Sequence, residues 1–429
     1  MAHDSRRTLM AAGQAARAMA LLSTDQKNQV LESFASKIEA NCSTLLKANA
    51  KDLSASKGKI TPALVSRLEL SEAKIEMIVK MIREVRQLED PVGKILRHME
   101  LDSGLEMIKK TVPLGVLVVV FESRPDVIPQ ISSLVVKSGN AVVLKGGREA
   151  QFTNSAFEKI WREAGQAFDF LPKKWLQQVA GREEFRSLLK HHDLIDLVIP
   201  RGSNALVTSV MKHTKAPVLG HAEGICAMFI HESAIIDTAL ELVIDAKLQA
   251  PSTCNAIETL LVQSSIAKEF FTRFQEINDE MKIQILGCPR TRKLLKGAKK
   301  ASDNDFHKEF GDERLAVKVV DSLTAAIDHI NSYGSHHTDT IVAQDTVACA
   351  QFFDYVDSAT VLSNASTRFN DGYRLGLGAE VGVSTSKLHV RGPAGLDSLV
   401  TTKFIVTGDG QVVSDYTGTT PRPFKHKLL

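Results

Sequence analysis

The chain contains two short apolar runs, Gly115-Val116-Leu117-Val118-Val119-Val120-Phe121 and Ala141-Val142-Val143-Leu144, on either side of a stretch with helical periodicity. Neither run alternates apolar and polar residues, which is typical of a strand that is buried on both faces. A further helix is expected at residues 150–164, and a third apolar run follows at residues 194–199. This alternation predicts a parallel sheet covered by helices on both faces, a doubly wound α/β fold.

The pattern continues in both directions along the chain. Apolar positions three and four apart predict helices in the N-terminal part, at residues 5–22, 24–50 and 61–88. A second α/β unit is expected later, with a helix at residues 233–249 and strands at residues 256–262, 315–320 and 340–343. Residues 363–395 are crowded with glycine and polar side chains, as in loops that line a cleft.

Composition and charge exclude several classes of protein. The 429 residues carry a formal net charge of +3 without a basic block, so nucleic acid is not expected as a partner. The longest strongly apolar run falls far short of the roughly 20 residues of a membrane-spanning helix, and no apolar signal segment follows the first residues. The five cysteines are scattered along the chain, which indicates a reducing compartment, and we expect the cytoplasm.

Two strand ends are candidates for binding a phosphate group. The Gly-x-Gly-x-x-Gly fingerprint of many dinucleotide-binding proteins follows none of the predicted strands. Instead, Lys145-Gly146-Gly147-Arg148 and Arg201-Gly202-Ser203 each close a strand before a helix, whose N-terminal N–H groups and dipole favour an anion. Ordinary strand-to-helix turns would explain the same residues, because glycine and serine are common in turns. Both interpretations stay open at this point.

Cys254 is the candidate nucleophile. It lies in the turn Ala250-Pro251-Ser252-Thr253-Cys254-Asn255-Ala256, between a predicted helix and a predicted strand. Small polar neighbours allow a thiol to be exposed and its pKa to be lowered, and both favour nucleophilic attack. The alternative is a buried structural cysteine, which is our interpretation of Cys42, Cys288 and Cys349. The histidines show no metal-binding spacing, so no metal site is expected.

Several segments together resemble the γ-glutamyl phosphate reductase family of the aldehyde dehydrogenase superfamily. They match in order across nearly the whole chain, so the resemblance is far more specific than any one motif. The segments are Phe121-Glu122-Ser123-Arg124-Pro125, Lys137-Ser138-Gly139-Asn140-Ala141, residues 251–259, Gly376-Leu377-Gly378-Ala379-Glu380 and His389-Val390-Arg391-Gly392-Pro393. The resemblance implies an aldehyde dehydrogenase-like fold and reduction of L-glutamyl 5-phosphate by NADPH, the second step of proline biosynthesis from glutamate.

The resemblance also implies roles for single residues. Cys254 is implied as the nucleophile that forms a thioester, with Ser123 and Asn255 beside it in the catalytic group. Glu309 lies in a stretch that resembles the place where the superfamily holds the nicotinamide ribose. The implied cofactor site then consists of Glu309 and the two strand ends, with residues Lys145, Gly146, Gly147, Arg201, Gly202 and Ser203.

The substrate is expected to need positive charge in the site. Guanidinium groups match phosphate and carboxylate oxygens in a bidentate manner, so we expect Arg124, Arg368 and Arg391 to bind the substrate. Lys145 and Arg148 are candidate contacts to the 2′-phosphate of NADPH, which is weak support for NADPH over NADH. No kinase sequence is fused to the chain, so a separate glutamate 5-kinase is the expected source of the acyl phosphate.

The resemblance implies three parts and an oligomer. We expect a cofactor-binding domain at residues 1–232, a catalytic domain at residues 233–390 and a C-terminal return and oligomerisation segment at residues 391–429. A hairpin at residues 95–113 and a late strand are implied as a β oligomerisation element, so a homodimer or homotetramer is expected.

The chain departs from the family pattern at a few positions. Asp126 stands where the family often has Asn, Ala227 where it often has His, and Ser132-Ser133 replace an apolar pair. Oxidative aldehyde dehydrogenases carry a glutamate that activates water, and His221 aligns with its place here. The alternatives are an NAD-dependent oxidative aldehyde dehydrogenase, a non-catalytic homologue that acts as a binding scaffold, and a cysteine hydrolase. The missing glutamate argues against the first, and the retained Cys254 argues against the second.

Overall fold

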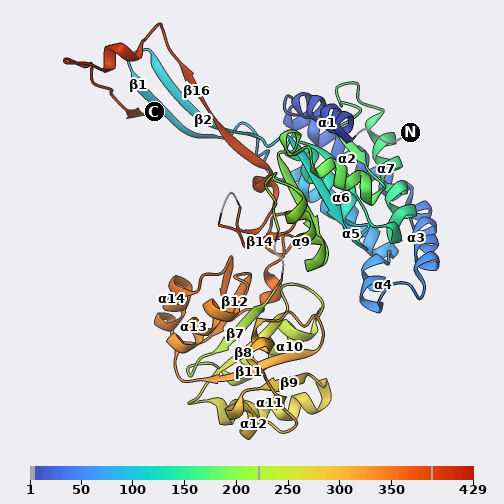
Figure 1. Ribbon diagram of the computed structural model, residues 1–429, viewed down its shortest axis with the longest axis vertical. Helices are drawn as coiled ribbons and strands as arrows, with labels where there is room; N and C mark the ends of the chain where they lie inside the picture. The colour runs from blue at the N-terminus through green and yellow to red at the C-terminus, as the bar shows by residue number, and fades with distance from the viewer. Residues whose placement is uncertain (1–4, 221–222, 388–389) are drawn as a thin grey trace.

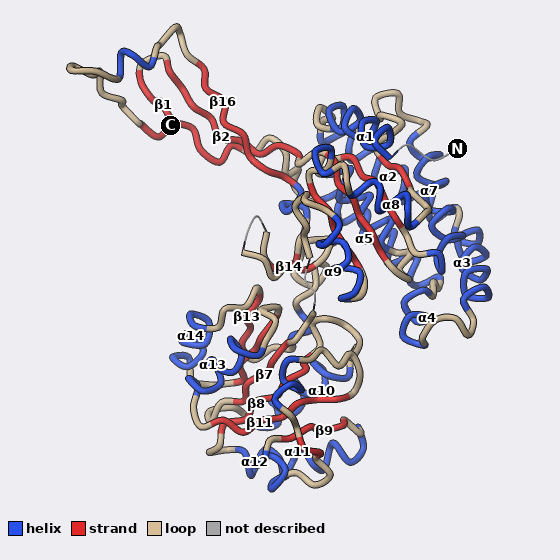
Figure 2. Tube along the Cα trace, in the orientation of Figure 1, coloured by secondary structure: helices blue, strands red, loops and turns tan. Residues whose placement is uncertain are grey.

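The chain folds into two α/β bodies and a long antiparallel sheet that projects from one of them (Figure 1). The computed structural model describes residues 5–220, 223–387 and 390–429. We call the part with the N-terminal helices the first body, the other α/β part the second body, and the projecting sheet the arm. Helices surround the strands in both bodies, whereas the arm consists almost entirely of strands and turns (Figure 2).

The N-terminal part is helical, as the periodicity predicts, but two of the expected helices are divided. The helices are α1 (Ser5–Met19), α2 (Thr24–Ala40), α3 (Cys42–Ser56), α4 (Pro62–Leu68) and α5 (Glu72–Gln87). The expected helix 24–50 ends at Asn41, whose side-chain amide donates to the carbonyl oxygen of Lys37 at 2.8 Å. The expected helix 61–88 restarts at Ser71, whose hydroxyl caps α5 by accepting from the N–H of Lys74.

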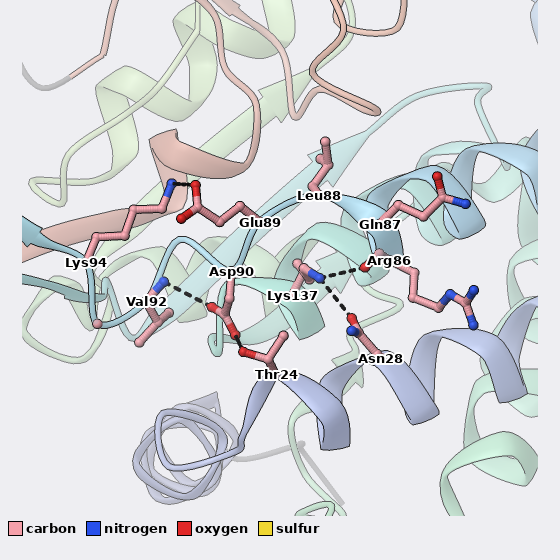
Figure 3. Close-up of a pocket in the computed structure, with 11 residues that line it drawn as sticks. Thr24, Asn28, Arg86, Gln87, Leu88, Glu89, Asp90, Val92, Lys94 and Lys137 are labelled. Carbon is pink, nitrogen blue, oxygen red and sulfur yellow. Dashed lines mark hydrogen bonds and ion pairs between the residues drawn. The ribbon is translucent and has the colours of Figure 1, made fainter.

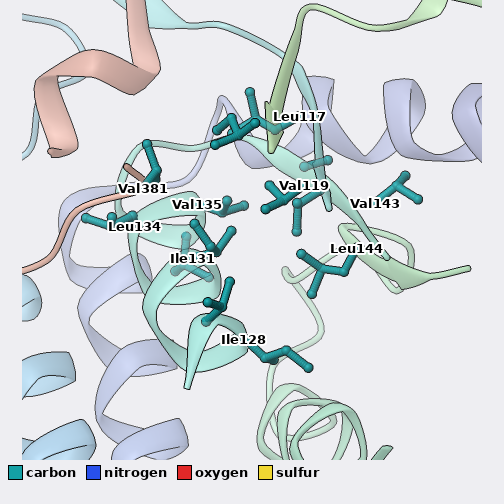
Figure 4. Packing of buried hydrophobic residues seen from close by; sticks show 14 of the residues in the cluster. Leu117, Val119, Ile128, Ile131, Leu134, Val135, Val143, Leu144 and Val381 are labelled. Carbon is teal, nitrogen blue, oxygen red and sulfur yellow. The ribbon is translucent and has the colours of Figure 1, made fainter. Parts of the chain in front are cut away.

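The sheet of the first body has four parallel strands in the order β5-β4-β3-β6. The strands are β3 (Val116–Phe121), β4 (Ala141–Lys145), β5 (Leu176–Gln178) and β6 (Leu197–Arg201), and the helices between and after them are α6 (Val127–Lys137), α7 (Gln151–Gly165), α8 (Arg182–Leu189) and α9 (Asn204–His213). Every residue of β3 is buried, as the unbroken apolar run predicts. Figure 4 shows Val119 and Leu144 of the sheet packed near Ile131 of α6.

The second body contains a seven-stranded parallel sheet in the order β10-β9-β11-β8-β7-β12-β13. The strands are β7 (Cys226–Ile230), β8 (Ile257–Gln263), β9 (Gln284–Gly287), β10 (Lys299–Lys300), β11 (Arg314–Val320), β12 (Thr338–Val342) and β13 (Thr360–Ser363), and the helices are α10 (Ile236–Leu248), α11 (Ala267–Met281), α12 (Pro289–Leu294), α13 (Leu323–Tyr333) and α14 (Thr346–Tyr355). Within the described residues, no helix is both long and apolar enough to cross a membrane.

The arm joins residues from two distant parts of the chain. β1 (Ile95–Asp102) and β2 (Leu105–Pro113) form the expected hairpin, and β16 (Val400–Thr407) pairs with β2 while β17 (Lys427–Leu428) pairs with β1, all antiparallel. Large apolar side chains on the arm are exposed, among them Ile95, Phe404 and Val406. A short ribbon of β14 (Val383–Ser384) and β15 (Gly392–Pro393) lies between the arm and the second body (Figure 1).

The second body is an insertion in the first. β7 belongs to the second sheet, because it pairs with β8 and β12, so the chain enters the second body before the expected boundary at residue 232. The chain has returned by residue 379, before the expected boundary at residue 390, since Ala379, Val381 and Ala394 are buried in the apolar core of the first body. Both crossings therefore lie earlier in the chain than the expected boundaries.

Asp52 of α3 links the helical layer to α7, and its loss is expected to destabilise the first body. Its carboxylate is 1% exposed and accepts from the N–H of Phe152 at 3.0 Å and from the N–H and hydroxyl of Thr153 at 2.8 and 2.6 Å. Asp52→Ala leaves these buried donors without a partner, so we expect about 2–3 kcal/mol less unfolding free energy in urea titrations followed by circular dichroism.

Asp25→Ala is the matched control for this measurement. Asp25 lies exposed in the first turn of α2, where a carboxylate interacts with the helix dipole through water. We expect a change within about 0.5 kcal/mol for this variant. Equal effects of the two substitutions would contradict the assigned role of Asp52.

Candidate active site

Cys254 lies in the turn between α10 and β8, and β7 holds this turn from one side. A Cβ atom at Gly224 would overlap the carbonyl oxygen of Cys254 and lie 2.6 Å from its Cα, so only glycine fits there. The thiol of Cys226 donates to the same carbonyl oxygen at 3.1 Å. The Cys254 thiol group is half-buried in its turn, and the backbone that carries it is fixed from behind.

Asn255 fixes the same turn against the late loop of the chain. Its amide Nδ2 donates to the carbonyl oxygen of Asn370 at 3.0 Å, and its own carbonyl oxygen accepts from the hydroxyl of Thr367 at 2.6 Å. Asn255 is buried, and its Oδ1 atom has no hydrogen-bond partner among the described residues. The structure therefore places Asn255 beside the thiol, where it orients the turn.

Three arginines share the electrostatic environment of Cys254. Burial lowers the pKa of Arg67, Arg201 and Arg368, and the charge of Cys254 acts in the opposite direction on all three. Arg67 also donates to the carbonyl oxygen of Ser252 at 2.6 Å, two residues before the thiol. Cationic groups at this range stabilise a thiolate relative to a thiol, which is the reactive form of a nucleophilic cysteine.

The three arginines expected to bind substrate lie in different places. Arg368 is buried next to the Cys254 turn and donates to the side chain of Gln249 at 2.8 Å. Arg124 lies 3.7 Å from Asp126, and its charge lowers the pKa of Arg67 and Arg201. Arg391 forms an ion pair with Asp357 at 3.0 Å and also donates to its carbonyl oxygen, so the structure joins it to the edge of the second body.

Arg201, which was expected at the cofactor, lies within the electrostatic influence of Cys254 and next to Glu380. Its guanidinium lies 3.7 Å from Glu380, and the two side chains are 11% and 16% exposed. Glu380 comes from the late glycine-rich segment and accepts from the N–H of Gly372 at 2.9 Å. Burial raises the pKa of Glu380, Arg201 opposes this, and Cys254 raises the pKa further.

Ser123 does not lie as an oxyanion donor would. Its φ angle is 44°, a left-handed conformation that non-glycine residues rarely adopt. Both of its donors are engaged with Glu149, because its N–H and its hydroxyl donate to the same carboxylate oxygen at 2.6 and 3.1 Å. The expected catalytic role of Ser123 is therefore not supported by its hydrogen bonds.

A carboxylate of the same body lies against the backbone at each of the two strand ends. The N–H of Ser203 donates to Glu122 at 2.9 Å, and the hydroxyl of Ser203 caps α9 by accepting from the N–H of Leu206 at 3.4 Å. A Cβ atom at Gly202 would lie 2.6 Å from the Glu122 carboxylate, and one at Gly147 would overlap the Glu149 carboxylate. Both turns therefore bring an anionic group against bare backbone, as a phosphate site requires.

Charged side chains shift the pKa of Lys145, in the turn that ends β4. Burial lowers the pKa of Lys145, and the charges of Arg182 and Arg148 act in the same direction, while Glu149 and Glu122 oppose them. Gly146 next to it packs against Asn154, whose side chain would be displaced by a Cβ atom. Lys145 at the carboxyl end of β4 is therefore under the electrostatic influence of two arginines and two glutamates.

Glu309 is connected to Cys254 through Gly224. Its carboxylate accepts from the N–H of Gly224 at 2.9 Å, and Gly224 is the residue packed against Cys254. The loop that carries Glu309 is held by Glu258, which accepts from the N–H of Gly311 at 3.0 Å and pairs with Lys247 at 2.6 Å in the interior. The structure therefore brings Glu309 and Cys254 together around Gly224. His221 and His389 lie outside the described residues.

A separate cavity lies away from these residues. It has a volume of about 720 Å³ and is lined by α2, α5, α6 and the segment that leads into the arm (Figure 3). Its charged groups have partners within the body: Lys137 donates to Asn28 and to the carbonyl oxygen of Arg86, and Lys94 pairs with Glu89. None of the residues expected for catalysis or cofactor binding lines it.

Sequence reasoning missed several residues of this site. Arg67 comes from the N-terminal helices, 185 residues before the backbone atom it contacts, and no local pattern distinguishes it. Glu380 lies in the quoted segment Gly376-Leu377-Gly378-Ala379-Glu380, so its position there was the available signal. Glu122 likewise lies one residue before Ser123, and Glu149 lies two residues after Gly147, and both of those neighbours were singled out in the sequence.

Comparisons with known proteins agree on the family. Residues 1–293 match the model of the aldehyde dehydrogenase family. The γ-glutamyl phosphate reductase of Natronomonas pharaonis is 45% identical over 423 residues, covering 97% of this chain and 96% of that protein. The enzyme of the same name from Methanococcoides burtonii is 43% identical, covering 100% and 98%.

Solved structures extend this likeness to the fold. The crystal structure of γ-glutamyl phosphate reductase from Thermotoga maritima has a TM-score of 0.90 and 33% identity, covering 96% of this chain and 100% of that chain. An acetylating aldehyde dehydrogenase from Geobacillus thermoglucosidasius shares the fold, with a TM-score of 0.66 at 17% identity, covering 95% and 97%. The expected aldehyde dehydrogenase-like α/β fold is confirmed. The chain belongs to the γ-glutamyl phosphate reductase family of the aldehyde dehydrogenase superfamily.

Proposed function

We propose that this enzyme reduces L-glutamyl 5-phosphate to L-glutamate 5-semialdehyde with NADPH and releases phosphate through a thioester on Cys254. The observation that carries the proposal is the position of Cys254 in a backbone-fixed turn within the field of three arginines. A thiolate needs this environment to attack, and an acyl phosphate needs the same positive charge to bind. The reaction is the second step of proline biosynthesis from glutamate.

The first chemical step joins the thiol to the substrate. The Cys254 thiolate attacks the acyl carbon, the new carbon–sulfur bond forms, and the bond from that carbon to the phosphate oxygen breaks. Arg368 and Arg67 are placed to hold the leaving phosphate, and Arg124 adds positive charge behind Arg67. The backbone N–H of Cys254 is the proposed donor to the developing oxyanion, and such a donor contributes roughly 3 kcal/mol in the transition state.

The residues at the strand ends fit a phosphorylated dinucleotide. The backbone at Ser203 and at Gly147 already accommodates carboxylates, and Lys145, Arg148 and Arg182 cluster beside the second of these turns. We propose that Lys145 and its basic neighbours hold the 2′-phosphate, and that Glu309 orients the nicotinamide ribose beside Cys254. When bound, NADPH would supply the hydride that reduces the thioester.

The proposed reaction needs no activated water. Thioester reduction ends with release of the aldehyde from the thiol. The glutamate that activates water in oxidative aldehyde dehydrogenases is therefore not needed in this reaction. Exclusion of water around Cys254 would protect the thioester from hydrolysis. The packing of Gly224 and Cys226 behind the turn contributes to this exclusion, because it leaves no room for water on that side.

We also propose that the enzyme acts in the cytoplasm as a homodimer or homotetramer that pairs through the arm. Apolar side chains that are exposed on the arm support this: Ile95, Leu96, Phe404 and Val406. A β-sheet with such a surface is normally covered by another subunit or segment. The substrate would come from a separate glutamate 5-kinase.

The nucleophile and the role of phosphate can be tested in the reverse direction. Wild-type enzyme is expected to reduce NADP⁺ with glutamate semialdehyde only when phosphate is present, measured by absorbance of the reduced nicotinamide. Cys254→Ser should lose this activity by at least about 1,000-fold, because the alcohol is a far weaker nucleophile than the thiolate. Cys42→Ser is the matched thiol control and should stay near wild type. Turnover without phosphate would instead identify an oxidative aldehyde dehydrogenase.

The choice between NADPH and NADH tests the basic cluster. Lys145→Ala removes one charge that faces the proposed 2′-phosphate, so KM for NADPH should rise roughly 10- to 100-fold while KM for NADH changes little. Steady-state kinetics with both cofactors measures the ratio, and Lys159→Ala, an exposed lysine on α7, serves as the control. An equal rise for both cofactors would remove Lys145 from 2′-phosphate recognition.

A further inference from the structure

Arg201 and Glu380 face each other without a direct hydrogen bond. Arg201 ends β6 of the first body, and Glu380 comes from the late segment that returns to it. The closest nitrogen and oxygen atoms of the pair are 3.7 Å apart, which exceeds the length of a charge-assisted hydrogen bond. Both side chains are largely buried, so this open geometry is costly unless another group completes it.

Both partners keep hydrogen-bonding capacity. Among the residues that the structure describes, the guanidinium of Arg201 donates no hydrogen bond, and the Oε1 atom of Glu380 accepts none. The other oxygen of Glu380 accepts from the N–H of Gly372, which fixes the carboxylate in place. Charged groups that are removed from water are normally hydrogen-bonded. The pair is therefore oriented towards a ligand with one positive and one negative group.

The pair lies in the electrostatic field of Cys254, and other carboxylates there are already engaged. The charge of Cys254 acts on both Arg201 and Glu380. Glu309 accepts from the N–H of Gly224 and belongs to the proposed cofactor site. Asp371 accepts from the N–H groups of Tyr373 and Arg374 through one oxygen. Glu380 is thus the carboxylate that is best placed to receive a cation from the substrate.

We propose that Glu380 and Arg201 recognise the amino-acid end of the substrate, with Glu380 accepting from the α-ammonium group and Arg201 donating to the α-carboxylate. This assignment rests on the proposed function and names the residues that determine its specificity for the amino-acid end of the substrate. Arg67, Arg124 and Arg368 are then left to hold the phosphate. Arg201 moves from the expected cofactor site to the substrate.

The shape of the substrate agrees with this placement. The α-carbon lies three bonds from the acyl carbon, a span of roughly 4 Å in an extended chain, so its charged groups lie close to the attacking thiol. The ammonium nitrogen and the carboxylate carbon are both bonded to the α-carbon, so the nitrogen lies roughly 3 Å from a carboxylate oxygen, which is compatible with the open spacing of the pair. Binding exchanges one loose ion pair for two charge-assisted hydrogen bonds, each with its own partner.

The test compares two aldehydes in the phosphate-dependent reverse reaction. Glutamate semialdehyde carries the α-amino group, and glutarate semialdehyde has the same carbon chain without it. Glu380→Gln should lower kcat/KM for glutamate semialdehyde by roughly 10- to 100-fold, mainly through KM, because a hydrogen bond to a charged group is lost. The same variant should keep kcat/KM for glutarate semialdehyde within about 3-fold of wild type.

Controls separate recognition from structural damage. Glu158→Gln alters another glutamate paired with an arginine, on α7, and should change neither reaction. Glu380→Asp keeps the charge on a shorter side chain, so it replaces Glu380→Gln in the test if Glu380→Gln unfolds. It should also lose kcat/KM for glutamate semialdehyde and keep kcat/KM for glutarate semialdehyde. An equal loss with both aldehydes, or no loss with either, overturns the assignment.

Arg201→Gln provides the complementary measurement. With 4-aminobutanal, which lacks the carboxylate, the variant should match wild type, while it should lose roughly 10- to 100-fold with glutamate semialdehyde. Equal loss with both aldehydes would contradict the assignment of Arg201. Failure of the proposed function would look different, because wild-type enzyme would then show no phosphate-dependent turnover of glutamate semialdehyde at all.

Discussion

The backbone of Gly224 lies directly against the backbone of Cys254, and the rest of the active site is built around this contact. No residue with a side chain fits at Gly224, because its Cβ atom would overlap the turn that carries the thiol. The N–H of the same glycine binds Glu309, so one residue sets both the nucleophile and the proposed cofactor contact. A displacement of the backbone at Gly224 would therefore move Cys254 and Glu309 together.

Charge is divided between two regions of the site. Around the thiol, Arg67, Arg201 and Arg368 supply positive charge, which suits a substrate with an acyl phosphate and an α-carboxylate. At the carboxyl ends of β3 and β6, the N–H groups of Ser123 and Ser203 donate to the carboxylates of Glu149 and Glu122. These carboxylates show that both turns present donors to an anion without rearrangement of the main chain.

The sequence predicted the sheets far better than it predicted the site. Unbroken apolar runs located β3 and β4, because burial on both faces leaves a strong local signal. Cys254 and the glycine-rich strand ends could be singled out as candidates, because each follows or precedes a strand. Arg67 could not be found, since its contact to the Cys254 turn spans 185 residues and depends on how the helices pack. The bond from Ser123 to Glu149 could not be found either, because the fold brings these two residues together.

The insertion of the second body has a consequence for synthesis on the ribosome. Every strand of the second sheet, from β7 to β13, leaves the ribosome before Ala379, Val381 and Ala394 do. The core of the first body includes those three residues, so it stays incomplete while the second body already has all its strands. The usual order, in which the N-terminal unit folds first, is thus reversed at the last stage. Once residues up to about 370 have emerged from the ribosome, the nascent chain would present a second body with all its strands, joined to a first body whose apolar core is still open.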